Sequence, residues 1–189
     1  MAINLKIDDK ELKKAVSKLS SFPKEIPKAT SSALNRTITF TKKRINQEVR
    51  KEYNIKSSEV SKTLEIRKAN PSNLSALINS TGHRLTLGRF ASNIGSWKRG
   101  KNIKVKIKRS GAKNLNTTPK SFIAGLTGNS HVVRRDGKSA YPIKVLRTLS
   151  VPQMIANKDI SKSVMEEANE QLKKRINHEV EYRLSKHIK

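Results

Sequence analysis

The 189-residue sequence contains no cysteine. Disulfide bonds and thiolate-ligated metal sites are therefore excluded. Aromatic residues make up only 4% of the chain and apolar residues 34%. This apolar content is low for a compact core, but it is too high for a disordered chain. We expect a single domain over residues 1–189 that is elongated or that completes its core within an assembly.

The sequence also lacks the signals that direct a chain to or across a membrane. No apolar run approaches the roughly 20 residues that a spanning helix needs. The first residues, MAINLKIDD, contain acids early and have no apolar stretch of the kind found in signal peptides. We therefore expect no membrane partner and assembly in the cytoplasm.

Acidic residues are missing from one long stretch, although the chain as a whole carries a net charge of +26. Between Glu65 and Asp136 there is no acid, and this window contains 15 of the 41 Lys and Arg residues. Such a concentrated positive charge favours a polyanion or an acidic protein as partner. General solubility in a lysine-rich proteome is the simpler alternative, and it accounts for the chain ends better than for the acid-free window.

Two long amphipathic helices are predicted from apolar residues at helical spacing. The first begins near Lys24 or Pro27 and ends at about Tyr53, with Asn54 as its C-cap. The second begins by Lys158 and reaches the C-terminus. The first pattern lasts for about eight turns. Several β-branched residues weaken this helix locally, so packing of its apolar face, more than intrinsic propensity, must stabilise it.

Short strands are predicted where apolar and polar residues alternate. Asp136 and Gly137 are expected to form a tight turn with positive φ between the last two of them. The fold class is therefore α+β: a small, mainly antiparallel sheet packed against the two long helices, with a basic hairpin or loop excursion at about 91–120. The expected strands cover residues 2–7, 64–68, 74–78, 102–109, 122–126, 130–134 and 140–149, and short helices are expected at 8–19 and 57–64.

The predicted strand 102–109 presents one aliphatic face and one face made only of lysines. The lysines could follow a phosphate backbone without reading bases. Phe90 and Trp97 are the only aromatic residues nearby, too few for a platform on which single-stranded bases stack. An equally good alternative is a solvated edge hairpin whose lysines prevent aggregation, and an acidic face of a neighbouring subunit is a third. The candidate contacts to DNA or to an acidic partner are Lys98, Arg99, Lys101, Lys104, Lys106, Lys108, Arg109, Lys113, Arg134 and Arg135.

No catalytic constellation is present. The four histidines form no i, i+4 pair with a nearby acid, and the sequence has no Gly-x-Ser-x-Gly motif, phosphate-binding glycine loop or His-Glu-x-x-His motif. Acids are too few for a two-carboxylate hydrolase or a magnesium site. We therefore expect no catalytic residue, no metal site and no cofactor, which also disfavours a nuclease or toxin-like module.

Three groups of residues resemble the minor tail protein Z family of long-tailed phages and prophages. The likeness covers most of the chain in the same order and is weakest over 91–120. Thr148-Leu149 departs from the Gly-Pro that often stands there in the family. The matching residues are Ala33-Leu34-Asn35-Arg36-Thr37 with Arg50 and Tyr53-Asn54-Ile55; the Leu64–Leu77 region; and Phe122-Ile123-Ala124, His131–Arg135, Gly137, Pro142-Ile143 and Ser150–Met154.

The resemblance implies a non-enzymatic structural protein of the virion tail that acts in tail completion and head–tail joining at the head-proximal end. It implies other tail or neck proteins as partners, namely tail terminator, tail tube and connector. It also implies a homo-oligomeric ring, commonly sixfold, around a channel that holds the phage DNA. The alternative is a stand-alone, non-sequence-specific nucleic-acid-binding protein, which would bind a duplex with a salt-dependent affinity of roughly micromolar or better.

Overall fold

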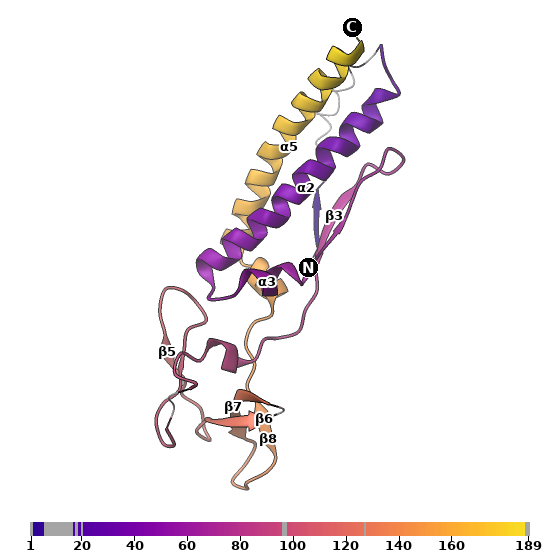
Figure 1. Cartoon of the computed structure of the whole chain (residues 1–189). Helices are drawn as coiled ribbons and strands as arrows, with labels where there is room; N and C mark the ends of the chain where they lie inside the picture. The colour runs from indigo at the N-terminus through magenta and orange to yellow at the C-terminus, as the bar shows by residue number, and fades with distance from the viewer. Residues whose placement is uncertain are drawn as a thin grey trace.

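The computed structural model describes residues 2–5, 17, 19, 21–95, 98–126 and 128–187. The molecule is elongated, with two long helices side by side at one end and short strands and loops at the other (Figure 1). We call residues 87–147 the β lobe and the remainder the helical part. The architecture is α+β, as predicted from the sequence.

The helical part is built on α2 (Glu25–Glu52) and α5 (Lys158–His187), both close to their predicted bounds. Ion pairs between the two helices show that they run antiparallel. Their facing sides form the main core, in which Leu34 and Ile38 of α2 are fully buried and Ile176 of α5 is 4% exposed. The pairs that join the helices are Glu25–Arg183, Arg36–Glu179 and Arg44–Glu167.

A three-stranded antiparallel sheet of order β1-β3-β2 belongs to the helical part. Its central strand β3 and its edge strand β2 contact α2. The predicted strands 64–68 and 74–78 correspond to β2 and β3, which pair with each other, although β3 begins two residues later than expected. The predicted helix at 8–19 lies outside the described residues except for 17 and 19, of which Leu19 is fully buried. The bounds are β1 Ala2–Leu5, β2 Leu64–Arg67, β3 Ala76–Ser80 and α3 Ser57–Ser61.

The β lobe contains two further antiparallel sheets, so the strands form separate small sheets and not one. A short 3-10 helix, η1, begins the lobe and packs against β7. The lobe has its own apolar cluster, which includes Ile103 and Val132. The bounds are η1 Leu87–Phe90, β4 Lys104–Val105, β5 Lys113–Asn114, β6 Phe122–Leu126, β7 Asn129–Arg135 and β8 Ile143–Val145.

The predicted tight turn at Asp136-Gly137 is wrong. β7 and β8 are joined by the longer loop 136–142, which is closed by a hydrogen bond from the Asp136 N–H to the Pro142 carbonyl at 3.0 Å. Pro142 has no N–H for the ladder, so strand pairing begins only at Ile143. The glycine with positive φ in this sheet is instead Gly128, at φ 76°, in the β6–β7 turn.

The predicted strand 102–109 is also shorter than expected. The alternation itself holds, because Ile103 and Val105 are buried. The backbone from 103 to 107, however, bonds to successive short segments and not to one partner strand. Its carbonyls accept from Leu115, Ser92 and Asn54, and its Lys106 N–H donates to Phe90, so that only Lys104–Val105 is a regular strand.

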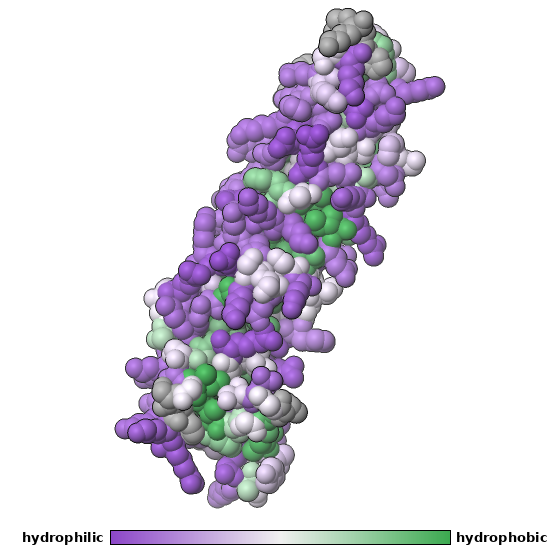
Figure 2. Space-filling model, viewed as in Figure 1, coloured by the Kyte–Doolittle hydropathy of each residue, from purple (hydrophilic) through white to green (hydrophobic). Residues whose placement is uncertain are grey.

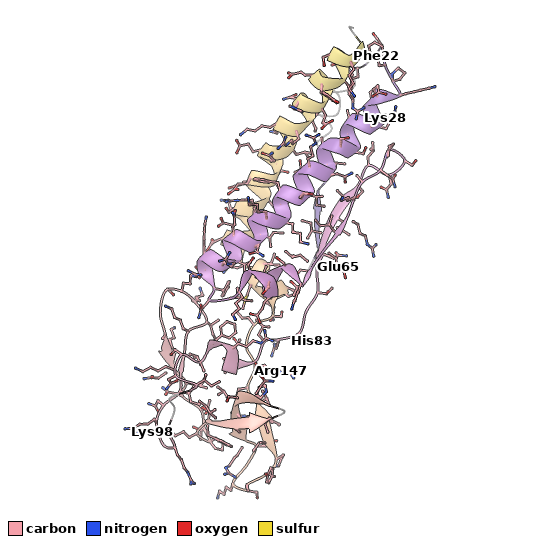
Figure 3. All side chains as sticks on the ribbon, viewed as in Figure 1. Phe22, Lys28, Glu65, His83, Lys98 and Arg147 are labelled. Carbon is pink, nitrogen blue, oxygen red and sulfur yellow. The ribbon has the colours of Figure 1, made fainter. Side chains whose placement is uncertain are left out.

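The β lobe joins the helical part through two backbone pairings. In the first, Leu85 bonds to Thr148 and Leu149, beside the isolated bridge between Thr86 and Arg147. Figure 3 shows Arg147 and His83 at this junction. The chain then enters α4 (Val151–Ile155) through a capping box, in which Ser150 and Gln153 each accept a hydrogen bond from the other's backbone N–H.

The second pairing attaches the end of the basic excursion to the end of α2. Tyr53 ends the helix as its C-cap, one residue before the predicted Asn54, and forms an isolated bridge with Lys108. Asn54 donates to Ile107 and Arg109 donates to Glu52, both at 2.8 Å. Ile107 packs against both apolar clusters and so links the two ends of the molecule.

Candidate interaction surface

Residues of the first family-like stretch have structural roles in the helical part. Ala33 and Leu34 are fully buried. The Asn35 side-chain amide donates to the Ala69 carbonyl and accepts from the Ala69 N–H, both at 2.8 Å, which holds the segment after β2 against α2. Arg36 pairs with the buried Glu179 of α5 at 3.1 Å. These residues therefore assemble the scaffold of the helical part.

The basic excursion is the most exposed part of the predicted interaction surface. Figure 3 shows Lys98 at the edge of the β lobe. The pairing of β4 with β5 places Lys104 opposite Asn114 and next to Lys113. Within the described part of the chain, the following candidates form no ion pair: Lys98, Arg99, Lys104, Lys106, Arg109 and Lys113.

Lys108 differs from the other lysines of the predicted face. Its Nζ lies 2.7 Å from the Glu52 carboxylate, at the point where the excursion meets α2. This hydrogen bond raises the pKa of Lys108. Lys108 is therefore engaged within the molecule, and the lysine face available to a partner is reduced to Lys104 and Lys106.

Arg134 and Arg135 lie on β7, in a different sheet from β4 and β5. Both are half-buried. The Arg135 guanidinium lies 5.5 Å from the centre of the Phe122 ring, and it donates to the Ser139 carbonyl at 3.5 Å. The two arginines are partly used for packing of this sheet, so they contribute less free charge than the sequence suggested.

A cavity of about 570 Å³ lies where the end of α2, the start of α3, η1 and the end of the basic excursion meet. Its lining carries four basic side chains and one acidic side chain. Arg89 pairs with Glu59, whereas the other three basic residues form no ion pair within the described part of the chain. The charged lining residues are Arg50, Lys56, Glu59, Arg89 and Arg109.

Three of the four basic lining residues, Arg50, Lys56 and Arg89, were not among the sequence candidates. Arg89 lies within the acid-free window, whereas Arg50 and Lys56 precede it and are surrounded in sequence by Glu48, Glu52 and Glu59, so local charge counting gave no reason to select these two. Their role depends on tertiary structure, because Glu48 and Glu52 are drawn into ion pairs with Arg44, Lys51 and Lys108.

The arrangement suits contact with anionic groups. Phe90, the described aromatic residue of the excursion region, is 3% exposed and offers no face for base stacking, whereas Trp97 lies outside the described residues. Among the described residues, no three His, Asp or Glu side chains gather in a way that would hold a metal ion. In the same part of the chain, no helix is long and apolar enough to span a membrane.

The sequence model described as prophage minor tail protein Z (GPZ) matches residues 10–189, nearly the whole chain. This match defines the class of the protein as a structural component of a phage tail. The chain therefore belongs to the prophage minor tail protein Z family, as the resemblance in the sequence indicated. No curated protein and no solved structure matches the chain significantly.

Proposed function

We propose that this minor tail protein is a non-enzymatic component of the head-proximal end of the tail, where it completes the tail and takes part in joining it to the head. Its partners there are tail terminator, tail tube or connector proteins, and its copies form a ring around the channel for phage DNA. Assembly takes place in the host cytoplasm, and the mature protein lies in the virion tail.

The observation that carries this proposal is the separation of roles along one elongated subunit. The helical part supplies a long body held together by the α2–α5 core and its ion pairs. The β lobe presents exposed basic residues on short strands and loops. Figure 2 shows hydrophilic residues over most of the visible face, with apolar patches over the middle and over the β lobe. A subunit of this form suits an assembly in which the body packs beside its neighbours and the lobe contacts an acidic protein or DNA.

The test is complementation of a phage that lacks this chain. Without the chain, electron microscopy of lysates should show heads and tails that remain unjoined or tails of abnormal length, and wild-type protein should restore infectious particles. The charge-reversed variant Lys104→Glu/Lys106→Glu should fail to restore them. The variant Lys162→Glu/Lys173→Glu, which reverses the same charge at exposed positions of α5, is the matched control and should succeed.

The acid-free window supports a stand-alone nucleic-acid-binding protein as the second candidate. That candidate predicts that the isolated chain binds duplex DNA at roughly micromolar concentration and with a steep salt dependence. It also predicts normal tails and normal joining in the phage that lacks the chain. Normal joining would therefore refute the tail-completion proposal.

A further inference from the structure

We infer that the basic cavity lined by Arg50, Lys56, Arg89 and Arg109 binds an acidic peptide segment of a partner protein. This inference rests on the proposed function, because the partner it implies is a neighbour in the tail. It adds a specific site, which none of the comparisons assigns, and a chemical class of ligand.

The charge balance of the cavity is the first argument. Each of its basic side chains comes from a different element or junction: Arg50 from α2, Lys56 from the turn before α3, Arg89 from η1 and Arg109 from the excursion. Glu59, the only acidic residue among the described lining residues, is already paired with Arg89. The three remaining cations repel one another unless an anion lies between them. Arginine guanidinium groups bind carboxylates in a planar, two-pronged geometry that suits this role.

The shape of the cavity favours a peptide over DNA. Its volume of about 570 Å³ lies within the range of pockets that enclose small ligands or a few side chains. Arg50, Lys56 and Arg109 are exposed, so peptide side chains that enter the cavity can reach them, whereas a DNA duplex is a convex rod that fits a hollow of this size poorly. A single strand would need aromatic faces for its bases, and Phe90 in the lining is buried.

The described part of this chain does not itself offer a suitable acidic segment. Most of its carboxylates are used in internal ion pairs. The described acids that form no such pair are dispersed over β2 and α5: Glu65, Asp159, Glu166 and Glu181. In a second copy the same described acids are dispersed over a chain with a net charge of +26, so its described part offers no acidic segment either. A different, acidic protein is therefore the occupant that the charges favour.

The inference is tested by binding of a fluorescent hexaglutamate peptide, with blocked ends, to the full-length protein in a fluorescence anisotropy titration. The cavity variant is Arg50→Gln/Arg109→Gln, and the matched control is Lys98→Gln/Arg99→Gln. All four residues are exposed, so both variants should unfold at the temperature of the wild type. The cavity variant should bind the peptide about tenfold more weakly or worse, because it loses the charge-assisted hydrogen bonds of two guanidinium groups to the peptide carboxylates. The control should change the affinity by less than about threefold, as expected for solvent-screened charges that do not line the cavity.

Three results would overturn the inference. The first is that the wild-type protein does not bind the peptide. The second is that both variants lose the same affinity for the peptide. The third is that the cavity variant loses binding to duplex DNA but keeps its affinity for the peptide. Sedimentation of the wild type and the cavity variant tests whether a second copy of the chain occupies the cavity. A difference in oligomeric state between the two would identify a second copy as the occupant and would contradict a foreign acidic partner. None of these binding measurements depends on where the protein lies in the virion, so failure of the inference is distinguishable from failure of the proposed function, which the complementation experiment tests.

Discussion

Lys108 pairs with Glu52 at 2.7 Å and thereby joins the base of the basic excursion to the end of α2. Backbone bonds from Arg109 to Glu52 and from Asn54 to Ile107 lie beside this pair. The excursion is therefore attached to the helical part at a defined point. One of the three lysines that the alternation placed on a common face stabilises this attachment, and only the other two remain available to a partner.

The first prediction concerns this attachment. Lys108→Glu places two negative charges side by side, which should loosen the junction and accelerate hydrogen exchange at the Arg109 and Asn54 amides. Lys104→Glu is the matched control, because Lys104 is exposed and has no acidic partner among the described residues. Mass-spectrometric exchange on both variants checks this, and equal exchange in the two would show that the pair does not hold the junction.

The α2–α5 core should dominate stability. Ile38 is fully buried between the elements of the helical part, so Ile38→Ala removes packing and leaves a cavity. The expected loss is about 2–5 kcal/mol in the free energy of unfolding, against about 0.5–1.5 kcal/mol for Ile38→Val. The exposed Lys43→Ala should change the value by less than about 0.5 kcal/mol. Urea denaturation measures all three, and a similar loss for the Ile38→Ala and Lys43→Ala variants would contradict the assignment of this core.

The capping box at Ser150 explains part of the family-like Ser-Val-Pro-Gln-Met stretch in physical terms. The Ser150 hydroxyl accepts from the Gln153 N–H at 3.4 Å, and the Gln153 side chain accepts from the Ser150 N–H at 2.9 Å. Ser150→Ala should cost about 1 kcal/mol in thermal or urea unfolding, whereas Ser150→Thr should retain most of the stability. If the alanine and threonine variants are equally stable, the cap is not what positions α4.

Acid should weaken the link between α2 and α5 at Glu25. Hydrogen bonds from Lys28 and Arg183 lower the pKa of Glu25 from 4.5 to about 2. The ionised carboxylate therefore stabilises the folded state fully above about pH 4.5, and this contribution is lost as the pH falls towards 2. Glu25→Gln should flatten the decline of the urea midpoint between pH 5 and 2.5. Glu166→Gln, at an exposed site with no ion pair among the described residues, should leave the decline unchanged, and an identical decline in wild type and Glu25→Gln would contradict the assignment.

The long helices could be predicted because their apolar stripes continue for many turns and nothing in tertiary structure competes with them. The lobe was harder, because its strands are short and its backbone changes partner every few residues. The run 140–149, for example, appeared as one strand, but it pairs with β7 up to Leu146 and then with the segment around Leu85. Pro142 was the signal in the sequence against a tight turn at Asp136-Gly137, because a proline has no N–H to donate within the strand that would follow such a turn.

The alternation along 102–109 predicted the burial of this segment in part. Ile103 and Val105 are buried and Lys104 is exposed as the alternation indicated, whereas Lys106 and Ile107 are both half-buried. The pairing of Lys108 with Glu52 and the gathering of Arg50, Lys56 and Arg109 in one cavity depend on which residues meet across the fold, and charge counts along the chain do not contain that information.

The central claim is that this minor tail protein lies at the head-proximal end of the tail. Immunogold labelling of intact virions and of isolated tails, with antibodies against the exposed β lobe, tests it most directly. We expect gold at the end of isolated tails that is opposite the distal tip, with access reduced once the head is attached. Labelling at the distal tip, labelling along the whole tail, or absence of the protein from purified virions by mass spectrometry would contradict the account.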